Sequence, residues 1–397
     1  KDTAHGDFSC NAALVSAKAF RSNPRAIATA ISERAYLDGT MFDKIEVAGP
    51  GFINFFVSGK WFSETVEKVI SLGADYGKVE LGKGKKVLVE FVSANPTGPM
   101  HIGNARGGAI GDCLASVLNA AGYEAKREFY VNDAGNQIEK FASSLNARYM
   151  QIFDESFIMP EDGYQGEDIK DLAKEFEAVN GDSFVSKDEA ERKEALVDFA
   201  LPKNIAKMQA DMKKYRIEYD KWFFESELHN SGKVKAVVDL LTEKGLTYEK
   251  EDALWYKNAE VVTERLKKSG MKDSDIEKLE LKDDVLIRAN GNPTYFAADI
   301  AYHKDKFDRG FDTCINIWGA DHHGHVARMK GAMDAIGLDG DKLDIVLMQL
   351  VRLVRNGEVV RMSKRTGKAI QLADLLEEVP VDSTRFLFNT REANTQM

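Results

Sequence analysis

The sequence predicts an α/β fold in which a large domain with a parallel sheet follows a smaller α/β domain. Val87–Phe91 is a nearly continuous apolar run, typical of a parallel strand buried on both faces, and a helix of small residues begins soon after it at Gly103. Strand and helix patterns alternate again over residues 285–380. This alternation indicates a sheet built from βαβ units.

The composition is that of a folded globular chain. Its 397 residues are 44% hydrophobic and 30% charged, which is ordinary for globular proteins and allows two or three domains. No apolar run approaches the ~20 residues that span a bilayer, and the first residues lack the apolar core of a signal peptide. Cys10, Cys113 and Cys314 lie far apart without CxxC spacing. We therefore expect no disulfide framework, no membrane association and a cytoplasmic location.

Residues 1–80 are expected to form the small α/β domain, and glycines between residues 73 and 84 mark the linker that follows it. Asn23-Pro24 is a typical helix start, with the proline in the first turn. Gly49-Pro50-Gly51 is a turn between two short strands. The predicted helices and strands are Asn11–Phe20, a helix from Pro24, Lys44–Val47, Phe52–Val57 and Trp61–Leu72.

Residues 81–380 are expected to form the large domain. The stretch at about 150–282 is mostly helical and polar, so we interpret it as an insertion between strands of the sheet. The chain ends, over residues 381–397, in what we predict to be the start of a further helical domain. Other predicted strands and helices are Gly103–Ala121, Ala125–Val131, Val285–Arg288, Pro293–Phe307, Thr313–Trp318, Val326–Ile336, Ile345–Leu350 and Leu372–Glu378.

The loop Ser93–Met100 delivers His101 and Asn104 to the carboxyl edge of the predicted sheet. Open α/β sheets bind ligands at this edge, and a helix start offers free N–H groups and positive dipole to a phosphate. His101 can donate to a phosphate oxygen, and Gly103 has no β-carbon to hinder an approaching base. These three residues are candidate nucleotide ligands, with an ordinary turn histidine as the alternative. No Walker GxxxxGK[ST] and no proper GxGxxG occurs.

A second candidate site is the basic segment 352–368, which contains six lysines and arginines and one acid, Glu358. It spans a predicted hairpin with Asn356-Gly357 as its turn, since this pair accepts φ > 0 at both positions. Lys364 can neutralise charge on the phosphates of a bound nucleotide, and Ser363 can donate to the same oxygens. The alternative is a solvated basic loop. A net charge of −10 argues against nucleic-acid binding over the whole surface but not against such a patch.

A third cluster, Asp321-His322-His323-Gly324-His325, follows the predicted strand Thr313–Trp318. Three histidines in four residues could suggest zinc, but no partnering CxxC or HExxH is present. We therefore predict no metal site. We assign Asp321 and His322 to nucleotide binding, together with Gln349 at the end of the next predicted strand.

Longer stretches around these residues resemble one family, the arginyl-tRNA synthetases. Segments 101–104 and 361–365 are similar to the two nucleotide signatures of class I aminoacyl-tRNA synthetases. Residues 1–80 resemble the family's additional N-terminal domain, through His5–Phe8 and Val47–Asn54. The stretches that carry the resemblance in the large domain are Glu90–Asn104, Tyr130–Gln137, Pro293–Tyr302 and Trp318–His325.

The resemblance implies a Rossmann-like class I catalytic domain and arginine–tRNA ligase activity. ATP and Mg²⁺ would be the cofactors, and L-arginine and tRNA(Arg) the partners of a monomer. The resemblance makes His101, Asn104 and Lys364 catalytic, and it adds Met362 and Ser363 to the ATP site. It also implies that Glu90, Asn95 and His101 hold the amino and carboxylate groups of arginine.

Selection of arginine has a physical explanation within this resemblance. Tyr295 and Asp299 lie four residues apart on one face of a predicted helix. A carboxylate offers two oxygens to a planar guanidinium, a match that lysine cannot reproduce. Without the resemblance, Asp299 would be an ordinary surface carboxylate of an amphipathic helix.

The chain departs from the family pattern in three places. Asn104 stands where class I enzymes often have His, and Arg361 opens the second signature in place of Lys. The family's helical anticodon-binding domain is expected after residue 397, so we interpret the chain as a fragment. Two alternatives stay open: a nucleotidylyltransferase on the same fold, and a non-catalytic tRNA-binding paralogue.

Overall fold

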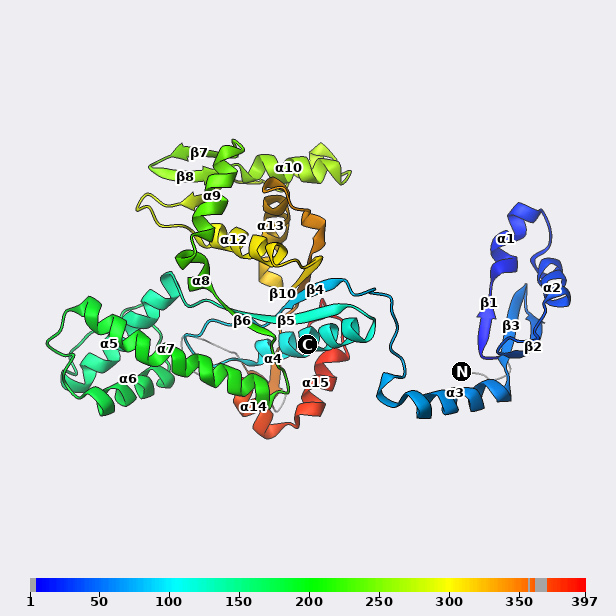
Figure 1. Cartoon of the computed structure of the whole chain (residues 1–397), viewed down its shortest axis with the longest axis horizontal. Helices are drawn as coiled ribbons and strands as arrows, with labels where there is room; N and C mark the ends of the chain where they lie inside the picture. Colours follow the sequence, from blue (N-terminus) through cyan, green and yellow to red (C-terminus); the bar gives the residue numbers. More distant parts are fainter. Residues whose placement is uncertain (1–4, 356–357, 361–369) are drawn as a thin grey trace. The chain divides into compact units, whose positions relative to one another are not determined.

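A computed structural model describes residues 5–355, 358–360 and 370–397 of the chain. The chain divides into two compact units, unit 1 at Lys1–Lys78 and unit 2 at Val79–Met397. Each is described by itself, with the elements labelled as in Figure 1.

Unit 1 contains a three-stranded antiparallel sheet in the order β1-β3-β2. Its small core gathers Ala13, Ala28 and Ile53. Side chains cap two of its helices: Asn23 accepts from the amide of Arg25, and Ser58 from that of Trp61. The predicted helices and strands of this domain are confirmed; β1 was not predicted. The elements are β1 (Phe8–Cys10), α1 (Ala12–Phe20), α2 (Pro24–Arg34), β2 (Phe42–Ala48), β3 (Phe52–Val57), α3 (Gly59–Leu72) and η2 (Gly73–Asp75).

Unit 2 is built on a five-stranded parallel sheet in the order β11-β10-β4-β5-β6. The order reverses between β4 and β10, because later strands add on both sides of β4. In open α/β folds, ligands bind in the crevice outside the carboxyl ends of the strands at such a point. The strands are β4 (Lys86–Glu90), β5 (Glu124–Val131), β6 (Lys221–Phe224), β10 (Thr313–Gly319) and β11 (Leu343–Met348).

Helices cover both faces of this sheet, which explains why β4 is apolar without alternation. Val87 and Val89 pack into a cluster that includes α4 (Ile102–Ala120). Leu88 points the other way, into a cluster that includes α12 (Tyr295–Asp308) and α13 (His323–Ala335). Figure 1 shows α12 and α13 on one side of the sheet and α4 on the other.

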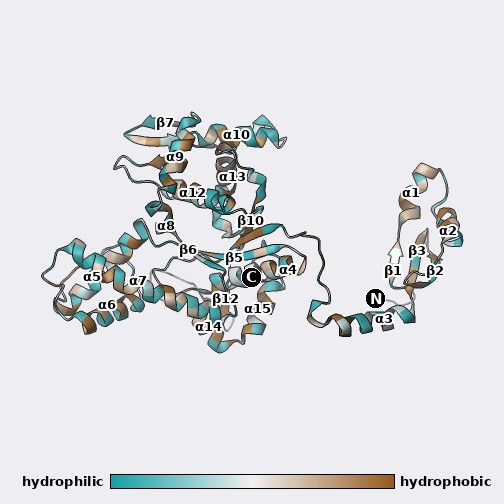
Figure 2. Cartoon of the chain, in the orientation of Figure 1, coloured by the Kyte–Doolittle hydropathy of each residue, from teal (hydrophilic) through white to brown (hydrophobic). Residues whose placement is uncertain are grey.

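The stretch predicted as one insertion at about 150–282 is divided by a strand of the central sheet. Before β6, three helices form a lobe with its own core around Phe141, Tyr149 and Phe176. Figure 2 shows hydrophilic and hydrophobic residues alternating along these helices, as in amphipathic helices that share a core. After β6, short helices and the antiparallel sheet β7-β8-β9 lead back to α12.

The lobe consists of α5 (Asn136–Phe153), α6 (Glu167–Asn180) and α7 (Glu189–Lys214). The segment after β6 consists of α8 (Glu225–Asn230), α9 (Lys233–Glu243), β7 (Thr247–Lys250), β8 (Ala253–Tyr256), α10 (Asn258–Lys268), α11 (Asp273–Glu277) and β9 (Asp284–Ile287). The remaining elements are η3 (Ala320–His322), η4 (Gly340–Lys342), β12 (Leu353–Arg355), β13 (Glu358–Val360), α14 (Leu372–Glu378) and α15 (Val381–Asn389). β12 and β13 pair antiparallel as predicted, and the turn Asn356-Gly357 lies outside the described residues.

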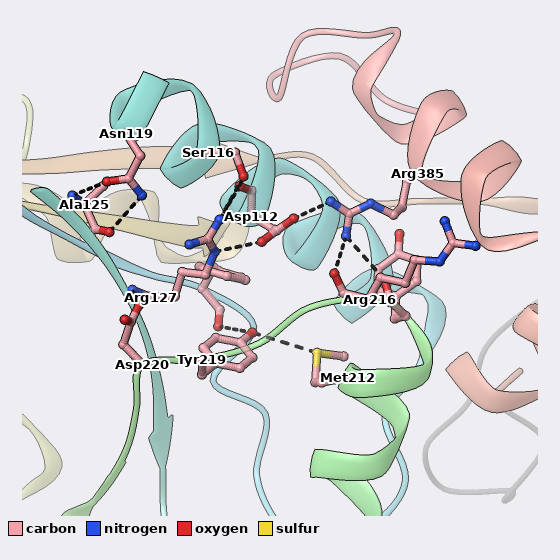
Figure 3. A network of polar contacts seen from close by, with 12 residues as sticks. Asp112, Ser116, Asn119, Ala125, Arg127, Met212, Arg216, Tyr219, Asp220 and Arg385 are labelled. Carbon is pink, nitrogen blue, oxygen red and sulfur yellow. Dashed lines mark hydrogen bonds and ion pairs between the residues drawn. The ribbon is translucent and has the colours of Figure 1, made fainter. Parts of the chain in front are cut away.

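We expected a separate helical domain to begin at residue 381, whereas α15 packs into unit 2. Its Phe388 is buried in the cluster that includes α4. Figure 3 shows the polar part of this contact, in which Asp112 of α4 accepts from Arg385 of α15 and from Arg127 of β5, the latter at 2.7 Å. Arg385 also donates to the carbonyl of Arg216 at 3.3 Å. One carboxylate thus joins α15 to the helix that begins with His101.

Candidate active site

His101 is the N-cap of α4, and its side chain is tied to the helix start. Nδ1 of His101 accepts a hydrogen bond from the amide of Gly103 at 3.1 Å. The side-chain oxygen of Asn104 accepts from the amide of His101 at 2.9 Å, which completes a capping box. Nδ1 acts as an acceptor, so the proton of the neutral ring is on Nε2. The ring can therefore act as a hydrogen-bond donor at the start of a helix.

The structure gives a further reason for a glycine at position 103, one that the sequence did not indicate. A β-carbon at this position would lie 2.9 Å from Cε1 of the His101 ring. The glycine therefore makes room for the capping histidine, whether or not a base approaches it. Gly111, one of the glycines spaced along α4, faces the ring of Phe91, where a β-carbon would clash at 2.2 Å. That contact brings α4 close to the sheet.

Glu90 ends β4 at the point where the strand order reverses. It is 7% exposed. Oε2 accepts from Nζ of Lys306 at 2.6 Å and Oε1 from Oγ of Ser93 at 2.8 Å. The turn after it is strained, since Val92 and Ser93 have φ of 72° and 41°, and a left-handed backbone is costly for a β-branched residue. Glu90 is thus fixed in place, with Lys306 as its buried counter-charge. Asn95, two residues beyond Ser93, is exposed.

Asp299 and Tyr295 lie on the first turns of α12, as predicted. The Asp299 side chain is 36% exposed, which leaves it accessible to a ligand, and Oδ2 lies 3.3 Å from Nε2 of His325. The ring of Tyr295 lies against Gly135, the N-cap of α5, where a β-carbon would be 3.5 Å from it. The Tyr295 side chain therefore reaches from α12 to the edge of the helical lobe.

Two residues that the sequence analysis missed lie beside Asp299, namely Glu225 and Tyr130. The Tyr130 hydroxyl, near the end of β5, donates to the carboxyl of Glu225, the first residue after β6. Burial raises the pKa of Tyr130, and the charges of Glu225 and Asp299 raise it further. Burial also raises the pKa of Glu225, opposed by hydrogen bonds from Tyr130 and His229. The available signal was position: Glu225 directly follows a strand of a parallel sheet.

Asp299, Glu225 and Glu90 therefore gather at one edge of the sheet. All three carboxylates raise the pKa of the same Tyr130 hydroxyl. Glu90 is neutralised by Lys306, whereas the ion-pair partners of Asp299 and Glu225 among the described residues are histidines, His325 and His229. Such a site favours a cationic ligand, because uncompensated carboxylates are costly unless a cation pairs with them.

The predicted nucleotide residues after β10 and β11 are less enclosed. Asp321 and His322 lie in η3 and contact each other at 3.2 Å, with side chains 77% and 58% exposed. Gln349 directly follows β11, and its carbonyl accepts from Nη1 of Arg106 at 2.8 Å. All three positions adjoin the carboxyl ends of β10 and β11. Met362, Ser363 and Lys364 lie outside the described residues.

Comparisons with known proteins match the chain to one family. Residues 1–57 match the family model "Arginyl tRNA synthetase N terminal domain", and residues 65–396 match "tRNA synthetases class I (R), catalytic domain". The chain belongs to the class I arginyl-tRNA synthetase family. This assignment confirms the resemblance stated from the sequence, the Rossmann-like α/β fold and the small domain before it.

Members of this synthetase family are similar in sequence to this chain over its whole length. Arginine–tRNA ligase of Caldanaerobacter subterraneus subsp. tengcongensis is 56% identical, covering 100% of this chain and 67% of the relative. That of Ruminiclostridium cellulolyticum is 54% identical, covering 100% and 68%. The solved arginyl-tRNA synthetase of Thermus thermophilus shares the fold with a TM-score of 0.65 at 20% identity, over 99% of this chain and 71% of that one. The chain thus spans about two thirds of each.

Membership of the class I synthetases implies that ATP is used. Within the described residues, no cluster of three or more His, Cys, Asp or Glu side chains is placed to hold a metal ion. In the same part of the chain, no helix is both long and apolar enough to cross a membrane. The edge of the sheet between His101 and Asp299 is the candidate active site of this synthetase.

Proposed function

We propose that the chain is an arginine–tRNA ligase that binds ATP and L-arginine at the carboxyl edge of the sheet. A carboxylate oxygen of arginine attacks the α-phosphorus of ATP, which gives arginyl-adenylate and pyrophosphate. The arginyl group then passes to the 3′-terminal ribose of tRNA(Arg). The protein is proposed to act as a cytoplasmic monomer.

The observation that carries the proposal is that the Asp299 and Glu225 carboxylates both lie close enough to the buried Tyr130 hydroxyl to raise its pKa. A guanidinium has five N–H donors in one plane and no acceptor, so it suits a site with two carboxylates and an aromatic side chain. Tyr295, 39% exposed, supplies a further ring and hydroxyl at the same edge. Glu90 and Asn95 are proposed to meet the amino and carboxylate groups at the other end of the substrate.

The nucleotide is proposed to bind at the start of α4. Nε2–H of His101 and the side-chain NH₂ of Asn104 act as donors to the phosphates. The first N–H groups of the helix favour negative charge at the same place. Asp321, His322 and Gln349 are proposed to contact the adenosine. Mg²⁺ is proposed to accompany the phosphates of ATP. Lys364, with Met362 and Ser363, is proposed from the sequence to neutralise the departing pyrophosphate.

Pyrophosphate exchange tests this function. The assay is run with each of the twenty amino acids, with and without tRNA(Arg). We expect exchange with arginine and not with lysine, because lysine cannot form the planar forked contact. A nucleotidylyltransferase would be independent of arginine, and a non-catalytic paralogue would show no exchange while still binding tRNA. Either result would contradict the proposal.

A further inference from the structure

An unbroken series of hydrogen bonds made by buried side chains connects the helix that carries Asp299 with the strand that ends at Glu90. Nδ1–H of His303 donates to the carbonyl of Asp299 at 2.7 Å, and Nε2 of His303 accepts from the Asn316 amide at 2.7 Å. The oxygen of Asn316 accepts from Nζ of Lys306 at 2.9 Å, and the same Nζ donates to Glu90 at 2.6 Å. We call His303, Asn316 and Lys306 the buried link.

The buried link has little freedom to rearrange. Its three residues are 3%, 0% and 0% exposed. Only one arrangement satisfies them all: lysine can only donate, so Asn316 must turn its oxygen to Lys306 and its NH₂ to a neutral His303. Burial, with the charge of Lys306, lowers the pKa of His303, in keeping with the neutral form. Breaking one bond leaves a buried polar group unpaired, so the whole series resists distortion.

The sheet fixes one end of the link. Asn316 lies on β10 directly opposite Glu90 on β4 in the parallel register, so the separation of these two residues is set by backbone hydrogen bonds. His303 and Lys306 both lie on α12, three residues apart and on one face. The link therefore sets where α12, and Asp299 on its exposed side, stands relative to the end of β4.

We propose that the buried link sets the length of the amino acid that the site accepts, because it fixes the distance between Asp299 and Glu90. The proposal rests on the proposed function, in which Asp299 holds the guanidinium and Glu90 the amino group. The two groups are the ends of one substrate, and the link fixes the spacing of the residues that receive them. His303, Asn316 and Lys306 would thus be positioning residues that determine specificity without touching the substrate.

The same helix provides a matched control. Tyr302 is also buried on α12, and its hydroxyl donates to Glu128 at 2.8 Å. That bond ties α12 to β5 and is not part of the series between Asp299 and Glu90. Tyr302→Phe therefore removes a buried hydrogen bond from α12 while leaving the link intact. A general loosening of the helix would appear in this variant as well as in the link variants.

The test compares L-arginine with L-homoarginine, which is one methylene longer. Calorimetric titration gives the dissociation constant of each ligand for the parent chain and for Asn316→Leu, His303→Gln and Tyr302→Phe. One methylene in a fitted pocket is worth about 10-fold or more, so the parent should prefer arginine by at least that factor. We expect this preference to fall by roughly threefold or more in both link variants, and to stay unchanged in Tyr302→Phe.

The outcomes are separable. If the link variants bind arginine and keep the parent's preference for arginine over homoarginine, the proposal is wrong. If all three variants lose this preference equally, the cause is a general loosening of α12, and the proposal is again wrong. If the parent binds neither ligand, the proposed function fails instead. His303→Gln keeps a donor and an acceptor, so it decides the question if Asn316→Leu does not fold, as thermal unfolding will show.

Discussion

The side-chain oxygen of Asn104 accepts a hydrogen bond from the backbone amide of His101 at 2.9 Å. The two polar residues of the first signature therefore hold each other, since the carbonyl of His101 in turn accepts from the backbone amide of Asn104 at 2.9 Å. This explains how asparagine can stand where class I enzymes often have histidine. Its oxygen caps the helix, and its NH₂ group can still donate to a ligand.

Substitutions at Asn104 should separate these two roles. Asn104→Asp keeps the capping oxygen, so the free energy of unfolding should stay close to that of the parent. It also replaces the donor with a negative charge, so ATP should bind more weakly. Asn104→Ala should lose both the capping-box hydrogen bond to the His101 amide, at about 1 kcal/mol, and the donor. Thermal unfolding and an ATP titration measure the two effects, and unchanged ATP affinity in Asn104→Asp would show that the residue only caps the helix.

Asp299→Asn should weaken arginine binding far more than ATP binding. Removing one charge from a desolvated, hydrogen-bonded pair costs roughly 2–5 kcal/mol, and an amide offers a single oxygen to the guanidinium. Calorimetry with arginine and with ATP measures both. Asp308→Asn on the same helix is the matched control, because Asp308 pairs with Lys304 at the surface, with a 52% exposed side chain. Equal arginine affinity in the two variants would remove Asp299 from the site.

Arg106→Lys should raise the KM for ATP. The guanidinium is fully buried on α4 and donates to the carbonyls of Gln349 at 2.8 Å and Glu392 at 2.9 Å. A lysine ammonium has no fork to span both, so the spacing between the start of α4 and the end of β11 should relax. Steady-state pyrophosphate exchange at varied ATP measures the change.

Arg192→Lys is the control for that substitution. Arg192 is also buried, at 6% exposed, and it donates to backbone carbonyls, including that of Lys187 at 3.0 Å, but within the helical lobe. Both substitutions should lower the free energy of unfolding, each by about 1–3 kcal/mol. Only Arg106→Lys should alter the KM for ATP. A similar KM change in both would mean that Arg106 acts through stability alone.

His303 should make stability depend on pH. Its pKa is lowered in the folded chain by burial and by Lys306, so below about pH 6.5 the unfolded chain binds a proton that the folded chain does not. The stability is fully present above that pH and is lost as the pH falls toward the lowered pKa. The slope for one proton is at most about 1.4 kcal/mol per pH unit.

Chemical unfolding of the parent and of His303→Gln from pH 8 to pH 5 checks this. The parent should lose stability relative to the variant as the pH falls. Glu225 does not confuse the comparison, because its raised pKa contributes equally to both proteins and with the opposite sign. If the free energies of unfolding of the two proteins change with pH in parallel, His303 can take up a proton while the chain is folded.

Local patterns in the sequence predicted much of the fold. The apolar run at Val87–Phe91, the helix after it and the paired strands around residues 353–360 appear as expected. So do the positions of His101 and Asn104 at a helix start and of Asp299 on a helix. These features depend on residues within a few positions of one another, where apolar spacing and turn chemistry determine the backbone.

What the sequence did not determine depends on contacts between distant residues. The short strands β1 and β6 form because partners 45 and 93 residues away complete them, as Ser9 pairs with Asn54 and Glu128 with Lys221. Glu225 reaches Asp299 only through the order of strands in the sheet.

The buried link shows the same limit most clearly. Lys306 and Glu90 are 216 residues apart, and nothing in either local sequence distinguishes their ion pair from a surface lysine and glutamate. The sequence by itself therefore determined the family, the helix starts and the strand faces. Only the tertiary structure decided which buried charges meet, because the topology of the sheet, and not local propensity, brings those side chains within hydrogen-bonding distance.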